Sequence, residues 1–409
     1  MRDKQAHSGV LRVVRALRHR NFRLFFGGQL ISLSGTWMQQ IAIGWLVYRL
    51  TASPFLLGLV AFSGQIPTFF MAPVAGVMAD RWNRHRVLVV TQTLSMFQAA
   101  VLAVLVLTGA VQVWHIVILS VFIGTVNAFD IPMRQAFFIE MIEDREDLGN
   151  AIALNSSIVN SARFIGPVIG GVIIAAGGEG ACFLLNALSY LAVIAALLGM
   201  KISRKEKAPS GRHVIEELKD GFFYAFGFAP IRSLLLLTGL ISFTGAPYGV
   251  LMPVFARDIL HGGPHTLGFL MASAGIGALI GTVYLAWRRG VAGLGMIIVL
   301  AVLILGAGLI VFSVSRQPWL SFFLIMFVGM GMMVCLASSN TILQTVVDDS
   351  KRGRVMSFYT MAFMGMAPFG SLVAGYAASR IGGPMTLVIG GIFCIIGSGI
   401  FARRLAGLP

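Results

Sequence analysis

The chain has 409 residues, of which 57% are hydrophobic and only 11% are charged. Soluble domains are about 45 to 50% apolar and about 25% charged, so this composition excludes an ordinary soluble protein and indicates a membrane protein. A formal net charge of +15 would suggest nucleic-acid binding in a soluble chain. In a membrane protein, the useful question is which side of the bilayer carries the positive residues.

Runs of about 20 apolar residues, the length that crosses about 30 Å of hydrocarbon, recur along the whole chain. We expect twelve spans, at residues 22–49, 54–79, 86–109, 113–138, 149–175, 181–200, 231–256, 264–286, 291–313, 318–345, 355–378 and 384–402. The sequence therefore predicts an all-α integral membrane protein with twelve transmembrane helices in two pseudo-symmetric halves, 1–200 and 231–409. Between the halves, residues 201–230 are first charged and then amphipathic, a pattern typical of a helix on the membrane surface.

Positive charge is distributed unequally between the two sides that these spans define. All 31 lysines and arginines fall on the side of the two termini except Arg49, Arg257, Arg316 and Arg380. Cytoplasmic connections carry an excess of Lys and Arg. We therefore expect both termini and the 201–230 linker to be cytoplasmic.

The two halves also share an internal repeat. A shift of 210 residues places Ser32 on Ser242, and it superposes Pro54 and Gly58 on Pro264 and Gly268. Duplicated halves are the construction of secondary transporters that rock around a central site. Chance matching of Gly and Ser in similar apolar sequence is the alternative.

The first predicted span carries a polar stripe. Gln29, Ser32, Thr36 and Gln40 are spaced by three, four and four residues, which places them on one helical face. Such a face is costly against lipid, so we expect it to line a cavity or to pack on another helix.

A charged motif follows the second span. It consists of Gly76, Asp80, Arg81, Arg84 and Arg86. This pattern resembles the signature loop between the second and third helices of the major facilitator superfamily, where the loop latches the cytoplasmic side while the cavity faces outward. An ordinary positively charged stop to the span is the alternative. The corresponding position in the second half, 286–290, has no acid, so the latch would be one-sided.

The resemblance extends over nearly the whole chain. The segments that carry it are NFRLFFGGQLISLSGTWMQQIAIGWLVYRLT, FDIPMRQAFF, NSARFIGPVIGG and RGRVMSFYT. They are similar to the branch of that superfamily that contains enterobactin exporters and other bacterial efflux proteins. The resemblance implies a protein of the bacterial inner membrane that exports a small molecule by alternating access, driven by an ion gradient. We expect a monomer that works by antiport, with protons or another ion as the coupling ion.

Two motifs of the drug-antiporter pattern, in its fifth and fourth helices, can be compared with this sequence. Gly166, Pro167, Gly170 and Gly171 match the Gly-Pro kink of the fifth helix, where proline removes a helix donor and glycines allow close packing. Ser120 stands where that pattern has an arginine in the fourth helix. The usual proton-coupling scheme therefore does not transfer directly.

Ionisable residues inside the spans are candidates for coupling, because charges within a membrane mark pathways or paired structural groups. Asp130 and Arg134 are separated by four residues in the fourth span, which also contains Asn127. Arg163 lies deepest, near the middle of the fifth span. We expect Asp130 and Arg163 to meet, either as a proton carrier with its partner or as a permanent structural bridge.

The second half supplies neutral polar groups, among them Tyr248, Asn340 and Gln344. A charge-poor cavity of this kind suits an amphiphilic or aromatic solute that carries an anionic group for Arg163. The sequence has no His-Glu-x-x-His, Gly-x-Ser-x-Gly or phosphate-binding glycine loop, so we expect a transporter without a cofactor or metal, and not an enzyme. An uptake transporter or a lipid translocase on the same scaffold is the alternative.

Overall fold

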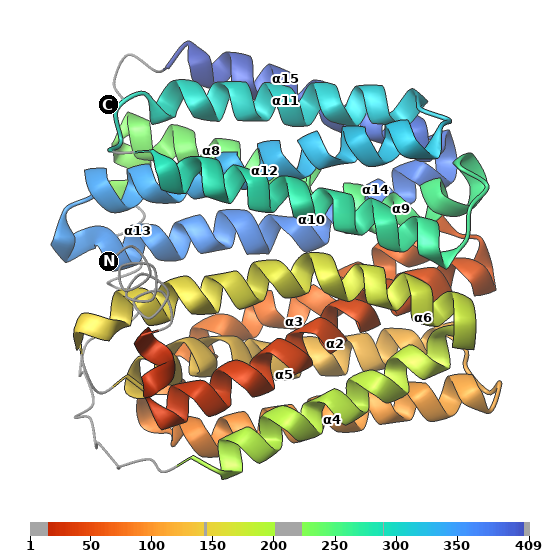
Figure 1. The fold of residues 1–409 in the computed structure, drawn as a ribbon. Coiled ribbons are helices and arrows are strands. Elements are labelled where there is room, and N and C mark those ends of the chain that lie inside the picture. The colour runs from red at the N-terminus through yellow and green to blue at the C-terminus, as the bar shows by residue number, and fades with distance from the viewer. Residues whose placement is uncertain (1–14, 143–144, 201–222, 289, 405–409) are drawn as a thin grey trace, which may run out of the picture. The chain divides into compact units, whose positions relative to one another are not determined.

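The computed structural model describes residues 15–142, 145–200, 223–288 and 290–404, and these residues form helices joined by short connections (Figure 1). The predicted all-α fold is confirmed. Within these described ranges, ten helical stretches are long and apolar enough to cross a membrane, judged by length and composition. The predicted surface helix in 201–230 lies outside the described residues as far as residue 222, as does the N-terminal tail before residue 15.

Contacts divide the chain into two compact units. The first unit comprises the described residues of Met1–Ile43 and Phe70–Pro209, and the second comprises those of Gly44–Phe69 and Ser210–Pro409. The turn of the first helical hairpin and the helix ends that flank it, residues 44–69, thus pack within the second unit although they come from the first half of the sequence.

The helices of the first half are long. They are the 3₁₀ helix η1 (Arg15–Arg18), α2 (Arg20–Thr51), α3 (Pro54–Arg81), α4 (Arg84–Leu107), α5 (Val113–Glu140), the 3₁₀ helix η2 (Arg145–Asp147) and α6 (Leu148–Leu198). Asn83 caps α4, because its side-chain oxygen accepts a hydrogen bond from the backbone N–H of Arg86 at 3.1 Å. Within α6 the backbone leaves helical values at Gly178, whose φ is 76°, so two helical segments meet there.

The second half continues the helical chain and contains two π-helical turns. Its elements are α8 (Ala229–Thr244), α9 (Tyr248–Val254), the π-helix η3 (Phe255–Ile259), α10 (Pro264–Trp287), α11 (Leu294–Val314), α12 (Pro318–Val346), α13 (Asp349–Thr360), the π-helix η4 (Met361–Gly365), α14 (Met366–Ile381) and α15 (Gly383–Ala402). Helices α10 and α11 both pack along α12, and α15 packs along α11 (Figure 1).

Glycines allow the helices to approach closely in both units. In the first unit, a Cβ on Gly166 of α6 would lie 2.8 Å from the Ser34 carbonyl oxygen of α2. In the second unit, a Cβ on Gly329 of α12 would lie 2.0 Å from the Ala274 carbonyl oxygen of α10. Backbones that pack this closely exclude any larger side chain and fix the register of the facing helices.

The predicted Gly-Pro segment of the fifth span lies on this packed face of α6. Gly166, Pro167, Gly170 and Gly171 are all buried, and a Cβ on Gly170 would lie 3.1 Å from the Met38 Cγ. The helix continues through Pro167. These glycines therefore hold α6 against α2.

Candidate functional site

The first unit contains a buried carboxylate, Asp130 on α5, which is 1% exposed. Two donors on α4 bond one of its oxygens: the Thr91 hydroxyl at 2.8 Å and the Gln92 side-chain amide at 2.7 Å. Arg134, one turn along α5, forms an ion pair with the other oxygen. Arg134 also donates to the side-chain oxygen of Gln29 on α2 at 3.1 Å. This Asp130 network therefore links α2, α4 and α5.

A charge in a medium of low dielectric constant is tolerated only when it is paired and hydrogen-bonded. Asp130 and Arg134 are neutral as a pair, and Thr91 and Gln92 satisfy the remaining carboxylate capacity. Adding a proton to Asp130 would leave Arg134 as a half-buried cation. The contacts therefore stabilise Asp130 and Arg134 as a neutral pair.

The prediction that Asp130 and Arg163 meet is wrong for this structure. The Arg163 guanidinium carbon lies 5.6 Å from the centre of the Trp37 ring, a cation–π contact between α6 and α2. Asp130 has its ion pair with Arg134 instead, because the residue four positions along the same helix is already a neighbour of its side chain. Among the residues that the structure describes, Arg163 therefore has an aromatic partner and no acid.

A chain of buried amides also links α2, α4 and α6 of the first unit. The Asn186 side-chain amide donates to the Gln39 oxygen at 2.7 Å, and the Gln39 amide donates to the Gln98 oxygen at 2.9 Å. The polar stripe predicted from the sequence includes Gln40 but not Gln39. Gln40 is exposed, whereas Gln39 is buried.

Two further candidate residues of the first unit, Thr36 and Asn127, are less buried. Thr36 is exposed, and its hydroxyl lies 3.4 Å from the Tyr190 hydroxyl. Asn127 is half-buried on α5. The sequence analysis also missed Thr91 and Gln92, whose signal was a run of polar residues at helical spacing inside the predicted span 86–109.

The candidates of the second half lie in the second unit. Gln344 donates its side-chain amide to the Asn340 oxygen at 2.8 Å, one turn apart on α12. Tyr248 is buried at the beginning of α9. Their role in binding a solute stays a prediction.

The predicted latch after the second span is described only in part. The side chains of Gly76, Asp80 and Arg81 lie outside the described part of the chain. Arg84 forms an ion pair with Glu140 at the end of α5, and Arg86 is exposed. The latch therefore stays a prediction.

Nearby, a buried carboxylate outside the spans anchors the N-terminal turn. The Asp147 side chain is fully buried, forms ion pairs with Arg15 and Arg18, and is hydrogen-bonded to the His19 ring nitrogen at 2.9 Å. Burial raises the pKa of Asp147, but the hydrogen bonds from His19 and Arg15 outweigh it, so the net pKa is lowered. The carboxylate therefore stays ionised and holds η1 beside the beginning of α6.

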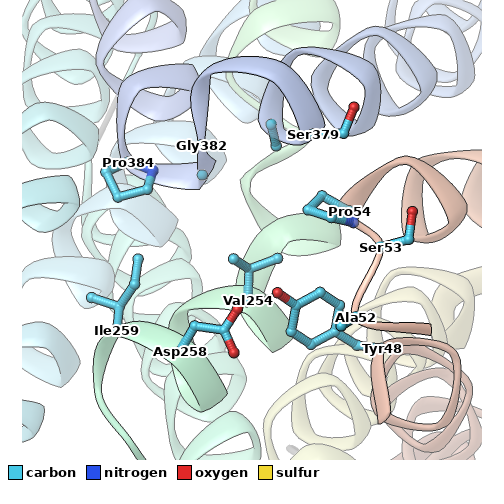
Figure 2. A pocket seen from close by; sticks show the side chains of 12 residues that line it. Tyr48, Ala52, Ser53, Pro54, Val254, Asp258, Ile259, Ser379, Gly382 and Pro384 are labelled. Carbon is cyan, nitrogen blue, oxygen red and sulfur yellow. Dashed lines mark hydrogen bonds between the residues drawn. The ribbon is translucent and has the colours of Figure 1, made fainter. Parts of the chain in front are cut away.

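A cavity of about 480 Å³ lies in the second unit, where the C-terminal end of α2 and the N-terminal end of α3 meet η3 and the turn between α14 and α15 (Figure 2). Tyr48, which is 2% exposed, donates its hydroxyl to the Asp258 carboxylate. Arg257 donates to the Tyr48 carbonyl oxygen at 3.1 Å, and its guanidinium carbon lies 5.7 Å from the Tyr48 ring centre. Tyr48 is thus held at its ring, its hydroxyl and its backbone.

The same hairpin is in backbone contact with α14. A Cβ on Gly58 would lie 2.5 Å from the Ser371 carbonyl oxygen, and a Cβ on Gly375 would lie 2.7 Å from that of Pro54. Ala52, in the turn between α2 and α3, has a φ of 47°, which is unfavourable for a residue with a side chain. The sequence analysis missed the pair Tyr48 and Asp258, because nothing local relates residues so far apart in the chain.

Comparison with known proteins covers nearly the whole chain. A family model described as a transmembrane secretion effector matches residues 13–406. The staphyloferrin A transporter of Staphylococcus aureus (strain NCTC 8325 / PS 47) is 29% identical over 375 residues, which cover 91% of this chain and 93% of that transporter. The macrolide efflux protein A of Streptococcus pyogenes is 22% identical over 395 residues, which cover 92% of this chain and 96% of that protein.

Solved structures show the same fold. A bacterial homologue of the human lysosomal transporter Spinster, in an inward-facing and unoccupied conformation, matches with a TM-score of 0.71 and 15% identity. The match covers 94% of this chain and 96% of that one. At this identity the likeness concerns the fold alone.

Proposed function

Because the chain belongs to the transmembrane secretion effector family of the major facilitator superfamily, we propose that it is a secondary active transporter that exports a small amphiphilic or anionic compound, of the drug or siderophore class, by proton antiport. It is a multi-pass membrane transporter, and not an enzyme. Its similarity to a staphyloferrin transporter and a macrolide efflux protein supports the two compound classes.

The architecture that we propose has twelve spans in two halves, with both termini cytoplasmic in a bacterial inner membrane. Among the described residues, ten stretches meet the length and composition criteria, and α2, which is 32 residues long, is not one of them. Counting α2, and counting the two segments of α6 that meet at Gly178 as separate spans, gives twelve. The excess of Lys and Arg on the side of the termini supports the orientation.

In alternating access, the site between the halves opens to one side at a time. We assign the contacts of Tyr48 with Arg257 and Asp258, and of Gly58 with Gly375, to the closed outer gate. Opening outward would require the 44–69 hairpin to leave η3 and α14. The gate is thus proposed from contacts within the second unit.

The observation that carries the antiport proposal is the buried Asp130 network. Asp130 is an acid in an apolar bundle, and its donors come from a neighbouring helix, so a helix movement that breaks those bonds would change its proton affinity. Arg163 is the cation left for an anionic group of the solute, because its partner is an aromatic ring.

The test uses purified full-length protein in vesicles that contain a pH-sensitive dye. A panel of siderophores and macrolides is placed on one side, and proton movement is recorded after each addition. Asp130→Asn keeps the shape and one acceptor oxygen but cannot take up or release a proton, so it should still exchange a transported compound for its labelled form but should move no protons. Glu146→Gln, an acid of the same unit that is 81% exposed and lies outside both the Asp130 network and the predicted latch, serves as the control and should keep both activities. Normal proton movement by Asp130→Asn would refute the proposal.

Proton-coupled uptake of an anionic compound is the second candidate, and the Asp130 and Arg134 pair favours it. Protonating Asp130 removes the negative partner of Arg134, so an anionic solute that binds Arg134 would bind together with the proton. Proton and solute would then move in the same direction. The vesicle assay separates the two candidates by the sign of the pH change.

A further inference from the structure

An apolar groove of about 470 Å³ runs between α4 and α5 in the first unit. Its walls expose only apolar atoms, which include those of Val90, Leu94 and Phe122. Trp82 closes one end by stacking on Phe129, with ring centres 6.3 Å apart and planes at 17°. The groove therefore has the size and the surface for hydrocarbon, and no polar atom that would bind a headgroup along its length.

The groove opens on a face of the first unit that is itself apolar. Val90 is 56% exposed and Phe97 59% on α4, and Ile118 is 57% exposed on α5. In a transporter with these helices as spans, an exposed apolar face of this kind is covered by lipid tails. A groove in that face is filled by a lipid chain, because an empty groove would forfeit the dispersion contacts of its walls.

An arginine in the first turn of α4 also lines the groove, and it does so with its apolar stem, because the walls expose only apolar atoms. Arg86 lines the groove within the first turn of α4, its side chain is exposed, and its guanidinium has no hydrogen-bond or ion-pair partner among the described residues. Arg84, two residues earlier, differs because it is paired with Glu140. Trp and Arg at the end of a span lie at the level of lipid headgroups, where Trp rings are enriched and Arg binds phosphate.

We propose that this groove binds an anionic phospholipid, with its phosphate at Arg86 and one acyl chain against Val90, Leu94 and Phe122. The charge of Arg86 selects the anionic headgroup, and the apolar walls take the chain. The inference is independent of which solute is transported and in which direction.

The bound chain would also touch the Asp130 network. Thr91 lines the groove and donates its hydroxyl to Asp130 at 2.8 Å. A lipid chain in the groove covers Thr91 and keeps water away from that bond. Thr91 thus separates the lipid in the groove from the Asp130 carboxylate.

The test measures quenching of Trp82 by brominated lipids around the full-length protein in vesicles. The Trp82 signal is the difference between the parent protein and Trp82→Phe, and brominated phosphatidylglycerol is compared with brominated phosphatidylcholine at equal bromine content. We expect phosphatidylglycerol to bind about fivefold more strongly at Trp82, the preference that one arginine supplies near a membrane surface. Equal quenching by the two lipids in the parent protein would overturn the proposal.

Two pairs of variants locate the site, each compared with its own Trp82→Phe partner. Arg86→Gln should abolish the preference, whereas Arg23→Gln, an exposed arginine at the beginning of α2 that does not line the groove, should keep it.

Val90→Phe fills the groove and should reduce quenching by both lipids, and Val104→Phe, on the exposed face of α4 outside the groove, should not. A preference that survives in Arg86→Gln, or quenching unchanged by Val90→Phe, would overturn the proposal. Quenching that a transported amphiphile competes away without any preference for phosphatidylglycerol would assign the groove to the solute and refute the lipid.

Discussion

The interiors of the two units differ in the polar groups that they bury. The first unit buries Asp130 and the amides of Gln39, Gln98 and Asn186, and all of them are hydrogen-bonded. The second unit buries small hydroxyls that have no hydrogen-bond partner among the described residues, namely those of Ser233, Thr238, Ser242 and Ser338.

Charge follows the same division. In the second unit, Arg257 and Asp258 both contact Tyr48, and both of these charged side chains are exposed. In the first unit, the charged side chain of Asp130 is buried among the helices. A group that exchanges protons inside a membrane must have donors that stabilise its charged form. Under the proposed function, we therefore expect proton exchange in the first unit and gating at the contacts of Tyr48 in the second.

The largest effect is expected from removing the buried acid. Asp130→Leu leaves Arg134 inside the bundle without its counterion, and removing one partner of a buried pair costs about 3 to 5 kcal/mol. Thermal unfolding of the purified protein in detergent measures this loss. The double variant Asp130→Leu with Arg134→Leu should recover most of the stability, because no unpaired charge is left. A single variant as stable as the parent would remove the basis for the comparison.

The second largest effect on stability is expected from the chain of buried amides. Gln98→Leu takes away the acceptor of the Gln39 amide, and an unsatisfied buried donor costs about 1 to 3 kcal/mol. Gln40→Leu is the matched control: its side chain is exposed, so we expect a change within about 0.5 kcal/mol. The same unfolding assay compares them. Equal effects of the two variants would contradict the assignment of Gln39 to the interior.

A smaller effect is expected at the outer gate. Tyr48→Phe loses the hydroxyl bond to Asp258 but keeps the ring beside Arg257, a loss of about 1 kcal/mol, which is about fivefold in the population of the open gate. The three native cysteines are buried, so a single Ser53→Cys in the cavity reports opening by its rate of labelling from outside intact cells.

Tyr376→Phe is the control for the gate. Its ring packs on Phe55 in the same unit, with ring centres 6.4 Å apart, and its side chain is 52% exposed. Labelling of Ser53→Cys should not change in this variant. A labelling rate that is equal in Tyr48→Phe and the parent protein would argue against the gate.

The smallest effect is expected from the unpartnered hydroxyls of the second unit. Thr238→Val keeps the shape and removes a hydroxyl that has no partner, so stability should change by less than about 0.5 kcal/mol or rise slightly. Ser338→Ala should behave alike. A loss above about 1.5 kcal/mol in either variant would mean that a water molecule or a solute binds there, and the two interiors would be more alike than the contacts indicate.

Local sequence was enough to predict the helices and one pair of neighbours on the same helix. Apolar runs of span length predicted the helices, and the separation of four residues placed Asp130 beside Arg134 on one face. The resemblance in the signature loop and the Gly-Pro segment indicated the family that the comparison shows.

Tertiary structure decided which of several possible partners each polar group has. Gln39 and Gln40 are adjacent in sequence but about 100° apart around the helix, and only the packing of the other helices determines which of them is buried. Arg163 lies over Trp37 and not beside Asp130, because glycines such as Gly166 set the register of α6 on α2. Tyr48 and Asp258 are 210 residues apart, and no periodicity relates them. Contacts between helices depend on register and rotation, which the one-dimensional pattern of a single chain does not contain.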